Sequence, residues 1–408
     1  MRESPSILLD ISRTVARARL PAPTGIDRVE RAYIRWASLR GGRFLGAFDG
    51  RQYLLEVDAV GDLLGWIEDG DDRPSLDLRG YLQVQRDLSL RTAQSLVRRM
   101  ARAVASPAGV ATMLREHMPG SGLYLNVGHD NLDAALMASL TRAGFGRAAM
   151  VHDTIPLDHP AFARHGTVET FRAKLNAAFR ADLLLANSQD TADRMRGHGA
   201  EQQIVTAPLG IDPVPAAASS APPAFLVLGT IEPRKNHALL LRIWRALWDQ
   251  MGEASPRLTI LGRRGWENRA VFDLLDSEPM MGRTVIEAGT PNDDTLAEHL
   301  ASATALLFPS HAEGYGLPMA EALAAGVPVI ASDLPALREV GGEAAEYLEP
   351  SDVETWKQRV LDYAALGSPQ RAARVAAIGD WQAPTWAQHF RIIENAIETI
   401  LVQGRNDV

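Results

Sequence analysis

Short apolar runs alternate with amphipathic segments along most of the chain. Each run has the length of a strand and ends in small or polar residues, and the segments between them carry apolar side chains at helical spacing. The predicted strands are 7–11, 123–127, 148–151, 181–188, 204–206, 225–230, 257–262, 284–289, 305–309 and 327–330. Strands that alternate with helices predict an α/β fold built on parallel, doubly wound sheets.

One segment rich in proline, alanine and serine interrupts this alternation. It spans 213–224, with the sequence PVPAAASSAPPA, and its composition is typical of an interdomain linker. A chain of 408 residues suits two domains. We therefore expect Rossmann-like domains over 1–212 and 225–380. Within the first, residues 44–80 are expected to form strands and loops.

The stretch 306–349 is expected to hold the main ligand site. A buried strand ends at Ser310, the glycine-rich segment EGYG follows, and a helix begins near Leu317. Unpaired N–H groups at a helix start, approached through glycines, suit a phosphate group. Glu313 and Glu321 flank this loop. The alternative is a surface loop before an ordinary capped helix.

A basic pair follows the strand 225–230. Arg234 and Lys235 stand at its carboxyl end, where ligands bind to parallel sheets. Arginine can fork onto two phosphate oxygens and lysine supplies a point charge, so the pair suits a diphosphate. An ion pair with nearby surface acids is the alternative.

Two His-Asp pairs end predicted strands, at His129-Asp130 and His152-Asp153. Such pairs occur in metal phosphohydrolases, but those sites place their ligands on packed helices. No metal site is therefore expected. A Rossmann dehydrogenase needs Gly-x-Gly-x-x-Gly, which the EGYG loop does not complete, and no P-loop motif occurs.

Charge and composition limit the classes of binding partner and the cellular location that we expect. The net charge of −8 gives no reason to expect nucleic acid, and the chain contains no cysteine. No apolar run has the ~20 residues of a membrane span, and the first ten residues lack a secretory signal. We expect a cytoplasmic protein. The arginine-rich segment 89–118 predicts either a basic helix on the inner membrane surface or the solvated face of a core helix.

The segment HAEGYGLPMAEALAAGVPVIAS resembles the signature of retaining glycosyltransferases of family 4, which have the GT-B fold. That signature pairs two glutamates, here Glu313 and Glu321, around a Gly-x-Gly-Leu-Pro core. GTIEPRKNH and VHDTIPLDHP also resemble family segments, most closely those of the bacterial mannosyl- and rhamnosyltransferase-like branch. The fold implied is GT-B, with two Rossmann-like domains facing each other across a cleft and the final helical region 381–403 crossing back to the first.

The resemblance also implies roles for individual residues. Glu313 would lie near the donor sugar and His152 would contact a sugar hydroxyl, unless that histidine only caps its strand. Arg234 and Lys235 would neutralise the diphosphate, and Glu321 would bind ribose. Gly25 would face the diphosphate from the first domain, unless it forms a plain turn. Further residues expected to contact the donor are Thr230, Thr290, Gly314, Tyr315, Gly316 and Leu317.

The function implied is retaining transfer of a hexose from a nucleotide diphosphate sugar, with GDP-mannose as first guess. The acceptor would be a glycan or lipid-linked glycan in surface polysaccharide or lipopolysaccharide synthesis. The nucleotide sugar is a substrate, and neither cofactor nor metal is expected. Two alternatives stay open: a non-catalytic nucleotide-sugar-binding protein, and another GT-B enzyme such as a sugar-nucleotide epimerase.

Overall fold

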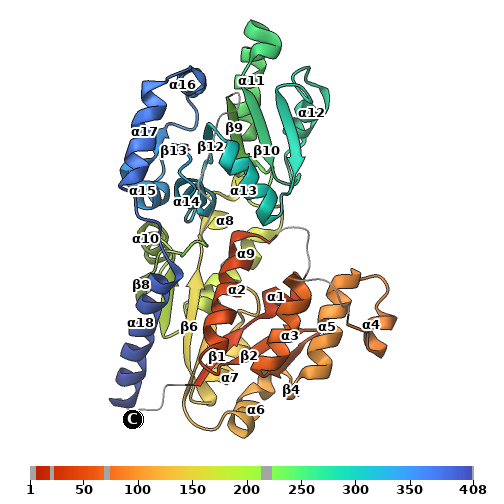
Figure 1. Ribbon diagram of the computed structural model, residues 1–408. Coiled ribbons are helices and arrows are strands. Elements are labelled where there is room, and N and C mark those ends of the chain that lie inside the picture. Colours follow the sequence, from red (N-terminus) through yellow and green to blue (C-terminus); the bar gives the residue numbers. More distant parts are fainter. Residues whose placement is uncertain (1–5, 19–22, 69–73, 213–222, 407–408) are drawn as a thin grey trace.

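The protein has two α/β domains, each built on one β-sheet, and loops that follow the strands of the two sheets meet between the domains (Figure 1). The computed structural model describes residues 6–18, 23–68, 74–212 and 223–406. Most of the predicted linker, residues 213–222, therefore lies outside the described residues. The apolar core of the first sheet continues into the second half of the chain through Tyr315, Ala320 and Val340, so the two halves share an interface.

The first sheet has eight strands in the order β4-β3-β2-β1-β5-β6-β7-β8. The strands are β1 Ser6–Asp10, β2 Arg43–Phe48, β3 Arg51–Leu55, β4 Ala103–Ala105, β5 Gly122–Asn126, β6 Gly146–Val151, β7 Leu183–Ala186 and β8 Gln203–Thr206. All pair in parallel except β3, which is antiparallel to β2 and β4. The prediction of a wholly parallel sheet is wrong at this edge, because Asp49 and Gly50 adopt the left-handed conformations of a tight hairpin turn.

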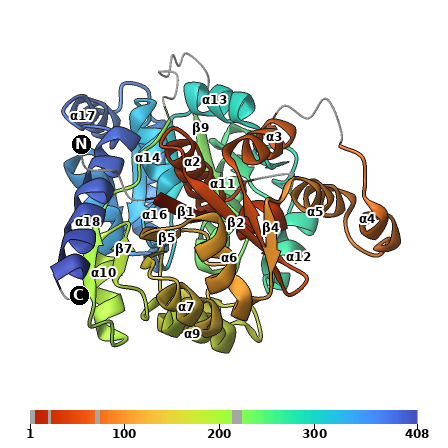
Figure 2. The same cartoon turned by 90° about the horizontal axis from the view of Figure 1, so that it is seen from below.

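Helices cover both faces of the first sheet (Figure 2). One face carries α1 Ser12–Ala16, α2 Gly25–Ser38, α3 Val57–Glu68 and α5 Leu88–Met100. The other carries α6 Val110–His117, α7 Ala134–Arg142, α9 Thr167–Ala178 and α10 Gln189–Gly197. The short helices α4 Leu78–Leu82 and α8 Ile155–Asp158 lie in connections.

Two expectations for this half are wrong. The segment 44–80 contains the helix α3, whose Val60, Leu63 and Ile67 are buried in the core. The basic segment 89–118 is not one helix, because β4 separates α5 from α6. The apolar side chains of α5, such as Leu96 and Val97, pack in the core, so they cannot rest on lipid.

The second sheet has six parallel strands in the order β11-β10-β9-β12-β13-β14. They are β9 Ala224–Leu228, β10 Arg257–Leu261, β11 Val285–Gly289, β12 Ala305–Phe308, β13 Val329–Ser332 and β14 Glu346–Leu348. Its helices are α11 His237–Met251, α12 Arg269–Ser277, α13 Asp293–Ser302, α14 Leu317–Ala324, α15 Pro335–Gly341, α16 Val353–Ala364 and α17 Pro369–Gly379.

The last helix, α18 Trp386–Asn406, leaves the second sheet and runs along the first (Figure 1). Tyr33 on α2 places its hydroxyl 2.7 Å from Nε2 of His389, and the indole N–H of Trp36 donates to Glu394 over 2.9 Å. These buried polar contacts fix the end of the chain to the first half.

Candidate active site

The loop between β12 and α14 forms the centre of the site. Gly316 precedes the helix with φ of 102°, a conformation that favours glycine, and a Cβ atom there would lie 2.6 Å from Leu337. Pro318 occupies the first turn, where no N–H is needed. No described side chain caps this helix start. Met319 and Ala320 donate to the Gly316 carbonyl, and Pro318 has no N–H. Among the described contacts, the N–H groups of Gly316 and Leu317 are therefore the ones left for an anion.

Glu313 in this loop meets both predicted cations. Its Oε1 lies 2.5 Å from Nζ of Lys235 and its Oε2 lies 2.9 Å from Nη1 of Arg234. Arg234 also pairs with Glu232 over 2.8 Å and donates to the Ala312 carbonyl. The short helix 233–235 after β9 presents both cations. The structure thus brings together three of the predicted site residues.

Burial and charge oppose each other in this cluster. Burial alone would raise the pKa of Glu313, but Arg234 and Lys235 outweigh it and hold that pKa at about 2. Burial lowers the pKa of Lys235 and is only partly offset by Glu313. Burial also raises the pKa of Glu232 above its usual value. Glu313 is thus a fixed negative charge between two cations.

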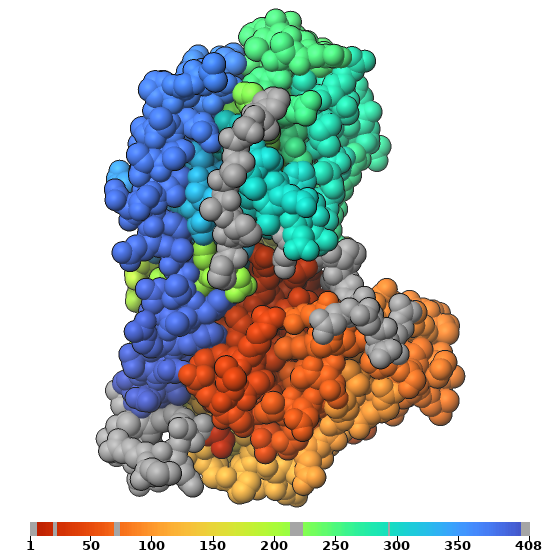
Figure 3. Space-filling view, in the orientation of Figure 1, coloured from red at the N-terminus to blue at the C-terminus, as the bar shows by residue number. Residues whose placement is uncertain are grey.

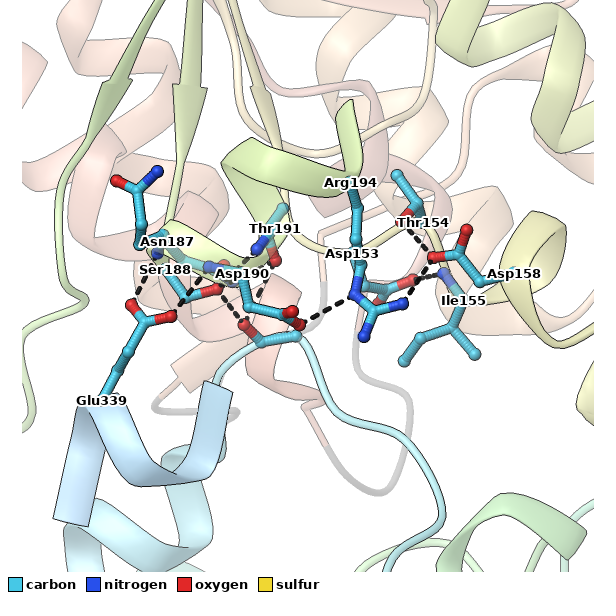
Figure 4. A network of polar contacts seen from close by, with 12 residues as sticks. Asp153, Thr154, Ile155, Asp158, Asn187, Ser188, Asp190, Thr191, Arg194 and Glu339 are labelled. Atoms are coloured by element: carbon cyan, nitrogen blue, oxygen red, sulfur yellow. Dashed lines mark hydrogen bonds and ion pairs between the residues drawn. The ribbon is translucent and has the colours of Figure 1, made fainter. Parts of the chain in front are cut away.

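The same loop closes tightly onto the first domain. A Cβ atom on Gly314 would lie 2.0 Å from the carbonyl oxygen of His152, so this approach requires glycine. The Ser188 hydroxyl donates to the Gly314 carbonyl over 2.7 Å (Figure 4). The Tyr315 hydroxyl donates to the Leu209 carbonyl over 2.9 Å. Gly314 and Tyr315 thus hold the two domains together.

A carboxylate of the second domain caps a helix of the first. Glu339 on α15 accepts hydrogen bonds from the backbone N–H groups of Gln189 and Asp190 at the start of α10, over 2.6 and 2.7 Å (Figure 4). A negative charge at a helix N-terminus is favourable. Sequence reasoning missed this contact, because the partners are 150 residues apart.

The starts of α2 and α14 also meet. A Cβ atom on Gly25 would lie 3.0 Å from Cδ1 of Leu317. About one turn further along each helix, Arg28 forms an ion pair with Glu321. The side chain of Glu321 is only 9% exposed, and Arg28 was not among the predicted residues.

His152 follows β6 and is buried. Its ring Nε2 lies 2.7 Å from the Val127 carbonyl oxygen, and its backbone N–H donates to Nε2 of His129 over 3.2 Å. Burial lowers the pKa of His152 to about 4, so its ring is neutral at physiological pH. The backbone contact is a structural partner of the kind that the capping alternative predicted, and contact with a sugar stays a prediction.

The two predicted threonines lie further out. Thr230 follows β9, and a Cβ atom on Gly265 would lie 2.6 Å from its methyl group, so Thr230 packs on the loop after β10. Thr290 follows the edge strand β11 and is exposed. No described contact connects Thr290 to the Glu313 cluster.

A cavity of about 140 Å³ opens beside Glu313 between the domains. Asp153, Arg194 and Asp190 line it from the first domain, and His311 and Glu313 line it from the second. Figure 4 labels Asp153, Asp190 and Arg194. Burial raises the pKa of Asp153, and Arg234 opposes this effect. The polar lining of this cavity suits the hydroxyl groups of a sugar.

The described residues contain neither a candidate metal site nor a candidate membrane span. No group of three or more histidine, aspartate or glutamate side chains there could hold a metal ion. No helix in that part of the chain is long and apolar enough to cross a membrane.

Residues 213–377 match the family model of glycosyl transferases group 1. This match covers the second domain, and the chain's similarity to the family lies there. It agrees with the predicted glycosyltransferase class. The matched region contains the uncapped helix start and the Glu313 cluster.

Two curated relatives of this chain are named mannosyltransferases. The serotype-specific mannosyltransferase WbdA of Escherichia coli is 32% identical over 250 residues, covering 53% of this chain and 30% of that protein. The O-antigen chain mannosyltransferase RfbU of Salmonella typhimurium is 42% identical over 143 residues, covering 35% of this chain and 38% of that protein. The chain thus matches about a third of each relative's length.

A solved structure covers the whole architecture. The crystal structure of Anabaena Alr3699/HepE in complex with UDP and glucose matches with a TM-score of 0.63 at 17% identity. The match covers 96% of this chain and 99% of that one. At this identity the likeness concerns the fold, and it confirms the predicted GT-B architecture of the chain.

Proposed function

We propose that this protein is a retaining glycosyltransferase that moves a hexose from a nucleoside diphosphate sugar to a hydroxyl of a glycan or lipid-linked glycan. The observation that carries this proposal is the buried Glu313 cluster beside the uncapped start of α14. Two cations beside the N–H groups of Gly316 and Leu317 at a helix start suit a diphosphate. The cavity beside Glu313 offers polar groups to a sugar.

The chemistry follows from this placement. The diphosphate would lie on the start of α14, with Glu321 on the ribose and Glu313 near the sugar. As the bond from C1 to the phosphate oxygen breaks, negative charge develops on the leaving diphosphate, and Arg234, Lys235 and the helix N–H groups stabilise it. The acceptor oxygen bonds to C1 on the same face, and its proton passes to the departing phosphate oxygen.

The sugar and the base are proposed from relatives. WbdA and RfbU are named mannosyltransferases, which supports mannose, with GDP-mannose as the first donor to test. The HepE structure holds UDP and glucose, which supports a nucleotide sugar but makes uridine diphosphate sugars the second choice. The name of RfbU refers to an O-antigen chain, which supports a role in lipopolysaccharide or other surface polysaccharide synthesis.

A lipid-linked acceptor would require access to the inner membrane surface. The segment around α4 projects from the side of the first domain (Figures 1 and 3). Its apolar side chains are 62% to 77% exposed at Leu78, Tyr81, Leu82 and Val84. Exposed arginines accompany them at positions 79 and 86. We propose that this surface, rather than α5, contacts anionic lipid from the cytoplasmic side.

Vesicle co-sedimentation tests the membrane contact. Wild-type protein should sediment with phosphatidylglycerol vesicles, and Leu82→Ser combined with Tyr81→Ser should remain in the supernatant. Leu366→Ser is the matched control, because Leu366 is fully exposed on the other domain. Equal sedimentation of all three proteins would contradict this contact.

A thermal-shift screen tests the donor site. GDP, UDP, dTDP, ADP and their sugars are added to wild type, Lys235→Ala and Arg269→Ala, with and without EDTA. One diphosphate family should raise the melting temperature of wild type and of Arg269→Ala, whose altered side chain is 89% exposed, but not of Lys235→Ala. EDTA should change nothing. Absence of any shift would contradict the proposal.

The two alternatives predict different products. Binding of a donor without transfer or hydrolysis of its sugar would favour a non-catalytic nucleotide-sugar-binding protein. Appearance of an epimeric nucleotide sugar would favour an epimerase.

A further inference from the structure

The charges at the donor site are already balanced within the protein. Arg234 and Lys235 face two carboxylates, Glu232 and Glu313, at distances of 2.5 to 2.9 Å. A nucleoside diphosphate brings at least two further negative charges into this site. The cluster by itself therefore supplies little net positive charge to a leaving diphosphate.

Arg28 is placed to supply it from the other domain. The close approach of Gly25 to Leu317 sets the start of α2 against the start of α14, where the diphosphate is expected. Arg28 lies one turn into α2, and its guanidinium pairs with Glu321, one turn into α14. The charged end of Arg28 thus lies between the proposed ribose and diphosphate positions.

The carboxylate of Glu321 cannot fully bind the ribose hydroxyls and Arg28 at the same time. This carboxylate would accept hydrogen bonds from the ribose hydroxyls, and the structure shows it paired with Arg28. Ribose hydroxyls that take Glu321 would weaken this ion pair and let the guanidinium turn towards the diphosphate. Arginine forms short, charge-assisted hydrogen bonds to phosphate oxygens.

We infer that Arg28 changes partner when the donor binds, from Glu321 to the diphosphate oxygens. This inference rests on the proposed function and extends it with a first-domain residue that contacts the donor. The exchange links donor binding to domain closure, because Arg28 can reach the diphosphate only while α2 lies against α14. Closure would then complete the positive site needed by the leaving group.

Calorimetric titration of paired ligands tests this inference. GDP, UDP, dTDP and ADP are first titrated into wild type, and the one that binds is then compared with its nucleoside. Arg28→Ala should weaken the diphosphate roughly tenfold, the effect of one lost hydrogen bond to a charged group. The nucleoside should bind equally well or more tightly, because its ribose no longer competes for Glu321.

Two further variants complete the design. Arg28→Lys keeps the positive charge but not the two-pronged guanidinium, so it should give an intermediate loss of diphosphate affinity. This variant also keeps the test possible if Arg28→Ala does not fold. Arg35→Ala is the matched control, since Arg35 lies on the same helix and pairs with Glu68 inside the first domain. That control should bind both ligands like wild type.

Two results would overturn the inference. Unchanged diphosphate affinity in Arg28→Ala would show that Arg28 does not reach the phosphates. Equal losses for diphosphate and nucleoside would show that Arg28 acts only by orienting Glu321 for ribose. If wild type binds none of the four diphosphates, the proposed function itself fails, and this inference fails with it.

Discussion

Replacing Glu313 by glutamine tests the electrostatic centre of the site. Glutamine keeps the size of the side chain and removes the charge that faces Arg234 and Lys235. Burial opposes ionisation of Glu313, yet the two cations hold its pKa at about 2, against 4.5 for an ordinary glutamate. At neutral pH this difference corresponds to roughly 3 kcal/mol of stability.

The sign of the pH dependence follows from the lowered pKa. A folded-state pKa below the unfolded value stabilises the protein fully above pH 4.5, and this stabilisation disappears as the pH falls towards 2. Glu313→Gln should therefore lower the free energy of unfolding by up to about 3 kcal/mol at neutral pH, and the deficit should shrink in acid.

Urea unfolding followed by tryptophan fluorescence measures both effects. Glu354→Gln is the control, because the Glu354 side chain is 78% exposed. That control should differ little from wild type at either pH. Equal stability of Glu313→Gln and wild type at neutral pH would refute the reasoning, as would a deficit that stays constant in acid.

Three other predictions concern the interface and the core. Glu339→Gln should weaken the hydrogen bonds to α10 by about 1 kcal/mol and raise the donor KM more than it lowers kcat, as steady-state kinetics would show. Gly314→Ala should abolish transfer while far-UV circular dichroism stays unchanged, because the new Cβ atom would block the approach of His152. Burial raises the pKa of Glu30 to about 8, so its contribution to stability is lost as the pH rises from 4.5 through 8. In urea unfolding, the stability of Glu30→Gln should not show this loss as the pH rises. If wild type and Glu30→Gln had the same pH profile of stability, this prediction would be wrong.

The strands and the loop between β12 and α14 could be predicted from the sequence for a physical reason. Strands buried on both faces are continuous apolar runs, such as 305–308 and 183–186, and these stand out in the sequence. The helix α11 likewise has a clear apolar stripe, because Leu240, Ile243 and Leu247 are buried on one side. Glycines and a proline around the start of α14 carry their own backbone signal.

Other elements gave weaker or overlooked signals. The helix α3 contains Gly61 and Gly65, which disfavour a helix locally, and burial of its apolar face overrides that preference. The turn at Asp49-Gly50 was a usable hairpin signal that sequence reasoning overlooked.

The interdomain contacts had no local signal at all. Arg28 and Glu321 are 293 residues apart, and Gln189 and Glu339 are 150 apart. Each residue alone resembles any charged or polar surface residue. Their partners become apparent only when the two domains are placed against each other, so these parts of the site required the structure.

Retaining transfer of a hexose would preserve the anomeric configuration of the donor in the product. The protein is incubated with GDP-mannose and a mannose-terminated glycan, and with UDP-glucose in parallel, and the new anomeric signal is followed by proton NMR. We expect consumption of one donor and an α-linked product, because the sugar of the donor is α-linked. A β-linked product, or no transfer from any nucleotide sugar that binds, would contradict retaining transfer.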